Sequence, residues 1–287
     1  MWRNYTKAEL DAQYDQKTVV SEEDFQLHRK HKAAESARVR AEMAASTLLD
    51  VPYGPGATET LDIFKAPLKG GPTHIFIHGG AWKSGKKDDV SYPAESFVAR
   101  GANYVALNFG LVPAVTLNEQ VRQARAAVAW TCAHARDFDA DPGRIFVSGH
   151  SSGGHVAGMV AVTDWERDFG LPADAVKGVA AISGMFDLEP VQHSWRNDYL
   201  SLDDATAALL SPIRHIPDHA PSLIVGYGAG ELDEFKRQSR EFAVAWRARG
   251  HSCVEIELPG LTHYEVNYQF NNPQGALLQA IFKQMSL

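Results

Sequence analysis

The chain has 287 residues, of which 45% are apolar, so it is long enough to bury a large core in one α/β domain. Its formal charge of −7 argues against nucleic acid or an anionic membrane surface as a partner. Its two cysteines, Cys132 and Cys253, form no C-x-x-C pair and are expected to be reduced thiols. No signal-like or membrane-length apolar run is visible, so we expect a cytoplasmic protein.

Residues 1–50 are predicted to form a helical extension. Residues 7–47 contain no proline or glycine and favour helix, with a break near residues 19–21. Ser21, followed by Asp24, is typical of a helix N-cap with an acidic first turn. A turn cluster is expected at residues 51–56, at the start of the main domain, which is predicted to span residues 51–287.

Strand and helix patterns alternate from residue 58 onward. Several strand segments are continuously apolar, which favours a parallel sheet covered by helices on both faces. The least regular segment, residues 185–220, is expected to form a lid or pocket wall over the carboxyl ends of the strands. Strands are predicted at residues 60–65, 74–78, 104–109, 144–148, 178–183, 222–227 and 252–258. Helices are predicted at residues 92–100, 117–138, 153–165, 203–210, 234–249 and 273–284.

A serine motif follows the strand predicted at residues 144–148. Residues 149–153 read Gly-His-Ser-Ser-Gly, a G-x-S-x-G pattern between a predicted strand and a predicted helix. Small residues beside Ser151 let the backbone turn tightly, so that the hydroxyl stands clear of both elements. Ser151 is therefore the candidate nucleophile.

Three further features each follow a predicted strand. A Gly-Gly loop precedes the serine motif in the chain, and an acidic pair and then a histidine come after it. Loop, serine, acid and histidine in this order are typical of the α/β-hydrolase fold. We therefore predict that fold, with a mostly parallel central sheet, helices on both faces and the N-terminal helical extension. The features are His78-Gly79-Gly80-Ala81-Trp82, the pair Glu231 and Asp233, and His263.

The chemistry assigns a role to each feature. Serine is a weak nucleophile until a base takes its proton, and His263 is the candidate base. A carboxylate on the other ring nitrogen would fix the tautomer of that histidine. Glu231 is favoured as the acid because it is closer to the preceding strand, and Asp233 remains the alternative, although it could instead cap the helix that follows.

Backbone N–H groups are expected to bind the oxyanion that forms when a serine attacks a carbonyl. Ser152 supplies the N–H group directly after the nucleophile, and Gly79 and Gly80 supply the others. Glycine is needed in the loop because a side chain would keep the backbone away from the developing charge. Losing one such donor typically costs about 3 kcal/mol of transition-state stabilisation.

The other histidines near these motifs are interpreted as structural. His78 and His150 are expected to hold loop geometry through hydrogen bonds. His215 and His219 have the spacing of a metal-binding pair, but Pro217 between them disrupts the helix that such a pair needs. No metal site is therefore predicted.

Aromatic residues near the strand ends are expected to form an apolar wall that favours a substrate ring through burial. Trp82 and Tyr264 are the substrate-binding candidates, and Met185-Phe186 and Trp195 are further members of the wall. Trp82 could equally be a core residue.

Three segments resemble the serine-type kynurenine formamidases (arylformamidases) and related bacterial esterases. The His78–Trp82 segment is similar to their H-G-G-x-W motif, and residues 143–155 are similar to their nucleophile region. Residues 231–239, Glu-Leu-Asp-Glu-Phe-Lys-Arg-Gln-Ser, are similar to their acid region, in which the triad carboxylate stands four residues before the phenylalanine. The resemblance covers residues 58–285 and implies that Glu231 is the acid and His263 the histidine, although animal enzymes carry Asp rather than Glu.

The resemblance implies hydrolysis of N-formylkynurenine, with side activity on small aryl esters, through an acyl-enzyme and without a cofactor. The expected partner is thus a small ester or amide substrate, and a homodimer is left open. A carboxylesterase of the hormone-sensitive-lipase type is the alternative, although that group has a third glycine where Ala81 stands here. A non-catalytic ligand-binding homologue is the remaining alternative, but the chain keeps the serine, the acid and the histidine.

Overall fold

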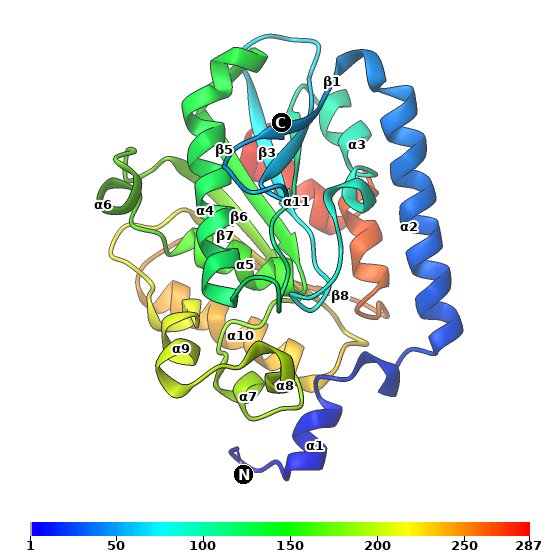
Figure 1. Cartoon of the computed structure of the whole chain (residues 1–287), viewed down its shortest axis with the longest axis vertical. Helices are drawn as coiled ribbons and strands as arrows, with labels where there is room; N and C mark the ends of the chain where they lie inside the picture. Colours follow the sequence, from blue (N-terminus) through cyan, green and yellow to red (C-terminus); the bar gives the residue numbers. More distant parts are fainter. Residues whose placement is uncertain (1) are drawn as a thin grey trace.

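Eight strands form one sheet in the computed structural model, which describes residues 2–287 (Figure 1). The strand order is β1-β2-β4-β3-β5-β6-β7-β8. The pairs β1–β2 and β2–β4 are antiparallel, and every other neighbouring pair is parallel. The strands are β1 (Thr47–Pro52), β2 (Thr60–Phe64), β3 (Gly71–Ile77), β4 (Asn103–Leu107), β5 (Ala140–His150), β6 (Val176–Ile182), β7 (Ser222–Gly228) and β8 (Cys253–Leu258). The α/β-hydrolase architecture predicted from the sequence is confirmed.

The helices divide between the two faces of this sheet. The α-helices are α1 (Lys7–Ala12), α2 (Glu22–Glu42), α3 (Ala94–Ala99), α4 (Leu117–His134), α5 (Ser152–Ala161), α6 (Trp165–Phe169), α7 (Glu189–Gln192), α8 (Asn197–Leu200), α9 (Asp204–Leu209), α10 (Asp233–Ala248) and α11 (Ala276–Met285). Side chains of α4, α5 and α10 share one buried core, and side chains of α2, α3 and α11 share the other. Short 3-10 turns cover Gln16–Thr18, Ala44–Ser46, Lys87–Val90, Ala135–Phe138, Pro212–Arg214 and Glu265–Asn271.

Strand β3 shows how the sequence builds both cores. Successive side chains of a strand point to opposite faces of the sheet. Ile75 and Ile77 belong to the core under α4, α5 and α10, whereas Phe76 belongs to the core under α3 and α11. A strand that is buried on both faces favours apolar residues at successive positions, as in Ile75-Phe76-Ile77, which is the continuous pattern found in the sequence.

The first strand was missed by the sequence analysis. Residues 7–47 were predicted to be helical, but α2 ends at Glu42 and β1 then pairs with β2. The turn cluster was predicted from Val51, but Val51 and Pro52 still belong to β1. The strand is short and exposed at the sheet edge, and its register shifts between Leu48 and Val51, so it carries no clear alternation. Pairing with β2, rather than local propensity, makes it a strand.

The N-terminal segment begins with two capped helices. Thr6 closes a reciprocal capping box with Glu9 at the start of α1. The predicted cap at Ser21 is confirmed, since its hydroxyl accepts the N–H of Asp24. Helix α2 runs along one side of the molecule, while α1 lies at the end where α7 and α8 are found (Figure 1). Among the described residues, no helix combines the length and apolarity that crossing a bilayer requires.

A buried carboxylate fastens the end of α2 to the sheet. Asp62 on β2 is fully buried and accepts hydrogen bonds from the Lys87 ammonium at 2.9 Å and from the Asp50 amide at 2.9 Å. Arg40 of α2 forms a further ion pair with the same carboxylate. Lys87 itself is almost completely buried, and three carboxylates offset its loss of water: Asp62, Asp50 at 2.6 Å and Asp88 at 3.3 Å. Asp62 is the one of the three that is fully buried.

We predict that Asp62→Asn destabilises the fold by about 1.5–3 kcal/mol, because Lys87 and Arg40 lose their charged partner on the buried strand while two other carboxylates still pair with Lys87. The free energy of unfolding from urea titration measures this effect. Lys69→Ala is the matched control, since Lys69 pairs with Asp139 at 2.9 Å while 84% of its side chain is exposed. That control should cost less than about 1 kcal/mol. Equal effects of the two changes would contradict the role given to Asp62.

Candidate active site

The turn between β5 and α5 holds Ser151 in a strained backbone conformation. Its φ is 60° and its ψ is −125°, a conformation that residues with side chains rarely adopt. The turn is tight enough that a Cβ atom on Gly149 would lie 2.1 Å from the carbonyl oxygen of Gly153. A Cβ atom on Gly153 would lie 2.2 Å from the carbonyl oxygen of Ile77. Both glycines of the motif are therefore required by close backbone approach.

A row of hydrogen bonds joins Ser151, His263 and Glu231. The His263 Nε2 atom is 2.9 Å from the Ser151 hydroxyl, and its Nδ1 atom is 3.1 Å from Glu231 Oε2. A carboxylate can only accept, so Nδ1–H donates to Glu231 and Nε2 is free to accept the serine proton. The exposed fractions of the three residues are 9%, 3% and 3%, in the order Ser151, His263 and Glu231.

Sheet topology explains why these distant residues meet. Ser151 follows β5, Glu231 follows β7 and His263 follows β8 by five residues. These strands are parallel and lie in the order β5-β6-β7-β8, so their carboxyl ends share one edge of the sheet. Ligands of open α/β sheets bind at that edge.

Two further groups hold Glu231. The Ser183 hydroxyl donates to Glu231 Oε1 at 2.5 Å, and the Gly228 amide donates to the same oxygen at 2.9 Å. The other oxygen, Oε2, is thereby left for His263. The sequence analysis missed Ser183, which has a φ of 50° directly after β6. A small polar residue followed by glycine at the carboxyl end of a predicted strand was the available signal.

The alternative acid, Asp233, lies outside this row of hydrogen bonds. Its side chain is 74% exposed and pairs with Lys236 at 2.9 Å. The sequence analysis offered an N-cap as its other role, and that role is wrong, because the N-cap of α10 is Leu232. Asp233 is instead the first residue of α10, where a negative charge interacts favourably with the helix dipole.

The Gly-Gly loop packs directly against the serine turn. A Cβ atom on Gly79 would lie 2.6 Å from the His150 carbonyl oxygen and 3.2 Å from Ser151 Cβ. Gly80 has a φ of 129° and lies against Ser84, so it too must lack a side chain. In the described chain, the N–H groups of Gly79, Gly80 and Ser152 donate to no protein acceptor. They are therefore available to an oxygen beside the Ser151 hydroxyl.

Three members of the predicted apolar wall belong to the core instead. Trp82 is 1% exposed, and its indole N–H donates to His155 Nδ1 at 3.1 Å. This burial favours the core alternative for Trp82 over the substrate-binding one. Met185 and Phe186 are fully buried, and Phe186 stacks on Phe242 at 4.5 Å, so their assignment to the wall is corrected. Their apolar character gave no means of separating core from pocket.

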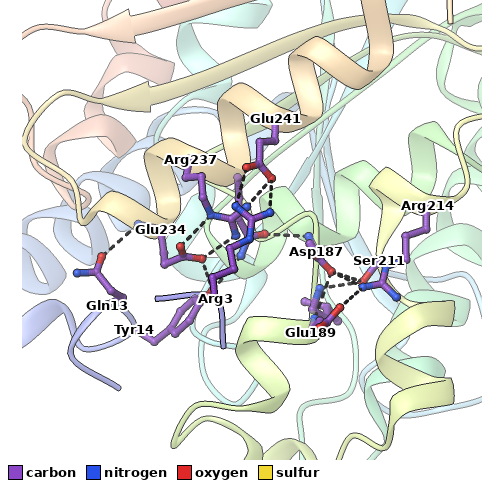
Figure 2. A network of polar contacts seen from close by, with 12 residues as sticks. Arg3, Gln13, Tyr14, Asp187, Glu189, Ser211, Arg214, Glu234, Arg237 and Glu241 are labelled. Atoms are coloured by element: carbon purple, nitrogen blue, oxygen red, sulfur yellow. Dashed lines mark hydrogen bonds and ion pairs between the residues drawn. The ribbon is translucent and has the colours of Figure 1, made fainter. Parts of the chain in front are cut away.

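Tyr264 is half-buried beside the candidate base. Its ring centroid lies 5.7 Å from that of His263 and 5.0 Å from that of Phe25 at the start of α2. The N-terminal segment therefore contacts the residue that follows His263. The same segment reaches α10, where the Tyr14 hydroxyl donates to Glu234 at 3.1 Å and Gln13 accepts the Glu234 amide at 3.1 Å (Figure 2).

Four buried histidines stay neutral in the folded state. Burial lowers the pKa of His74 to about 3, and burial is also the largest cause that lowers the pKa of His78 and of His155 to about 4. Burial lowers the pKa of His150 well below its ordinary value, and the charges of His263 and Lys32 act in the same direction. His78 Nδ1 lies 2.9 Å from the Gly79 carbonyl oxygen, which fits the structural role expected for it.

We predict that stability falls as the pH is lowered through the ordinary histidine pKa of about 6.5. Below that pH the imidazoles of the unfolded chain bind protons, whereas the buried imidazoles of the folded chain do not. The unfolded chain therefore binds more protons, and lowering the pH favours unfolding. The loss continues until the folded pKa values near 4 are reached. The slope of the unfolding free energy against pH gives the number of protons taken up on unfolding. In urea titrations between pH 7.5 and 5.5, above the carboxylate range, this number should rise by roughly three. His74→Gln should remove about one of them, and a flat profile would contradict the assignment.

Known proteins are similar to this chain in sequence and in fold. A family model described as BD-FAE matches residues 61–243. The kynurenine formamidase of Danio rerio is 28% identical over 99% of this chain and 98% of its own length. The esterase LipQ of Mycobacterium tuberculosis is 29% identical over 76% of this chain and 57% of its own length. Among solved structures, a candidate thioesterase from Silicibacter matches with a TM-score of 0.82 at 25% identity, over 95% of this chain and 98% of its own.

The expected relationship to arylformamidases and esterases is thereby confirmed. The relatives are named as hydrolases, and one of them matches the chain over nearly its full length. The chain is accordingly a hydrolase enzyme with an α/β-hydrolase fold. Because the family model covers more than half of its residues, the chain belongs to the BD-FAE family.

Proposed function

We propose that the enzyme is a serine hydrolase that removes a small acyl group, such as formyl or acetyl, from an amide or ester that bears an aromatic ring. The observation that carries this proposal is the continuous hydrogen-bonded row from the Ser151 hydroxyl through His263 to Glu231, with distances of 2.9 and 3.1 Å. Groups at these distances can transfer a proton without rearrangement. This row can activate the serine hydroxyl, and the free N–H groups beside it can bind an oxyanion. The two features together support acyl transfer as the reaction class.

In the acylation step, Ser151 Oγ attacks the substrate carbonyl carbon while His263 Nε2 takes the hydroxyl proton. Glu231 stabilises the resulting imidazolium through Nδ1–H. The carbonyl oxygen becomes an oxyanion and accepts hydrogen bonds from N–H groups of the Gly-Gly loop and of Ser152. When the tetrahedral intermediate collapses, His263 gives the proton to the leaving amine or alcohol, and the acyl group stays on Ser151.

Deacylation repeats these steps with water. His263 takes a proton from the water molecule as its oxygen attacks the acyl carbon, and the same N–H groups bind the second oxyanion. The bond to Ser151 Oγ then breaks, the serine recovers its proton from His263, and the carboxylic acid leaves. Every proton in the cycle moves through one imidazole nitrogen.

Burial of the reacting serine supports a small acyl group. Ser151 is only 9% exposed, between the Gly-Gly loop and the imidazole of His263. Tyr264 offers an aromatic face beside that imidazole, and we assign residues 185–220 as the wall of the substrate pocket. We assign the first part of the N-terminal extension as an arm that packs against this wall through Asp11 and Tyr14. The kynurenine formamidase relative supports a formyl-aryl amide of the N-formylkynurenine type as the substrate.

A general carboxylesterase is the second candidate function. The esterase relative favours it, although the comparison covers only 57% of that protein's length. The two functions differ in the acyl chain that they accept rather than in the chemistry. Substrate preference therefore separates them.

We predict that Glu231→Gln lowers kcat on the order of 10³-fold or more, because glutamine presents no negative charge to the imidazolium and does not fix the tautomer. Asp233→Asn is the matched control and should change kcat by less than about twofold, since an exposed ion pair contributes little. Steady-state kinetics with p-nitrophenyl acetate measure both. If Asp233→Asn were the impaired variant, the assignment of the acid would be wrong.

We predict a clear preference for small acyl groups on aromatic leaving groups. The values of kcat/KM for N-formylkynurenine and p-nitrophenyl acetate should exceed that for a p-nitrophenyl ester of a long fatty acid, because the buried serine leaves little room for a long chain. Ser151→Ala supplies the background rate, and its kcat should be lower by on the order of 10³-fold or more. Preference for the long chain would replace the small-acyl proposal with a lipase-like one.

A further inference from the structure

The segment leading into α8 carries three buried hydrogen-bond donors that have no partner. Arg196 is 5% exposed, and its Nε and Nη2 atoms donate to the Tyr14 carbonyl oxygen at 3.2 and 2.8 Å. Its Nη1 atom has no hydrogen-bond partner among residues 2–287, and the same is true of Trp195 Nε1 and the Tyr199 hydroxyl. A buried donor without a partner lowers the stability of the fold, so a group of three such donors needs an explanation.

These three donors lie together. The Arg196 guanidinium carbon is 5.5 Å from the centroid of the Trp195 ring, and the Trp195 and Tyr199 ring centroids are 6.0 Å apart. Burial raises the pKa of the Tyr199 hydroxyl, and the charge of the neighbouring Arg196 opposes that rise. The group therefore forms one polar cluster, which we call the α8 cluster (Trp195, Arg196 and Tyr199).

The α8 cluster borders the candidate active site through Lys83. Lys83 directly follows the Gly79–Trp82 loop, and its ammonium lies 4.2 Å from the Tyr199 ring centroid and 5.5 Å from that of Trp195. The charge of Arg196 also acts on Tyr264, the residue after His263. Burial raises the pKa of Tyr264 to about 12, and the charge of Arg196 acts against that rise.

The charges around the cluster favour an anion. Lys83 and Arg196 take part in no ion pair within the described chain, although the protein as a whole has a net charge of −7. The carboxylate of Asp11, which accepts the Trp195 amide at 2.6 Å, already pairs with Lys7 at 2.6 Å. Two unpaired cations and three unpartnered donors complement a group that only accepts hydrogen bonds.

We infer that the α8 cluster, with Lys83 beside it, is a subsite for a carboxylate carried by the substrate. This inference rests on the proposed hydrolase function and assigns residues to the recognition of a leaving portion that ends in a carboxylate, as the leaving portion of N-formylkynurenine does. Arg196 supplies the charge-assisted hydrogen bond, while Tyr199 and Trp195 donate from either side. The carboxylate then orients the scissile bond toward Ser151.

Competitive inhibition tests the subsite without knowledge of the natural substrate. The inhibitors are benzoate, phenylacetate, 3-phenylpropanoate and 4-phenylbutanoate, each compared with its primary amide in assays of p-nitrophenyl acetate hydrolysis. In the wild type, at least one carboxylate should bind about 10-fold or more tightly than its amide, the size expected for a charge-assisted hydrogen bond. In Arg196→Gln this preference should disappear, and in Tyr199→Phe it should fall while the aromatic ring remains.

Arg240→Gln is the matched control, on α10 and outside the segments assigned to the substrate pocket. Arg240 pairs with Glu257 at 2.9 Å, so its charge is already balanced. It should keep both the turnover and the carboxylate preference of the wild type. Arg196→Lys retains the charge and should recover part of the preference.

Three results would overturn the inference. One is a wild type that binds carboxylates and amides equally. Another is an Arg196→Gln variant that loses affinity for both in equal measure, which indicates a structural role through Tyr14. The third is inhibition by acetate alone as strong as that by the aryl carboxylates, which indicates a free-anion site. Absence of p-nitrophenyl acetate hydrolysis by the wild type would instead contradict the proposed hydrolase function itself.

Discussion

The left-handed backbone of Ser151 is the constraint on which the site depends. Residues with side chains adopt such a conformation only when their surroundings enforce it, at a cost of about 1–3 kcal/mol. Here β5 runs directly into α5, and the backbone crosses so closely that Gly149 and Gly153 have no room for a Cβ atom. The turn lifts the hydroxyl above the sheet edge and brings the first amides of α5 beside it. Gly79 packs against this same turn, so one rigid turn positions both the proposed nucleophile and the proposed oxyanion site.

Glu231 and His263 lie at the same edge of the sheet, and segments far apart in the sequence support them. Ser183 and the Gly228 amide fix one oxygen of Glu231, which leaves the other oxygen for His263. Glu234, three residues further along the chain, is held by Tyr14 from the N-terminal segment (Figure 2), and the carbonyl of Tyr14 accepts hydrogen bonds from Arg196. The N-terminal segment thus joins α10, which begins two residues after Glu231, to the irregular segment after β6. Proposals for both segments as walls of the pocket follow from this connection.

The sequence predicted the parts of the molecule that local rules decide. Continuous apolar strands indicated a parallel sheet, and small residues around Ser151 indicated the tight turn. The sequence could not predict β1, because only pairing with β2 makes that exposed segment a strand. It could not find Ser183, whose role appears only when β6 lies beside β7. It also could not separate Trp82 and Phe186 in the core from Tyr264 beside His263, since an aromatic residue suits either place.

Covalent labelling tests the central claim, that Ser151 is the attacking group, most directly. The enzyme is treated with a p-nitrophenyl phosphonate, and the intact mass and the modified peptide are then determined by mass spectrometry. The account predicts one phosphonyl group per chain, located on Ser151, with concurrent loss of esterase activity and no adduct in Ser151→Ala. Loss of activity with the adduct on another residue, or full activity with Ser151 modified, would contradict the account.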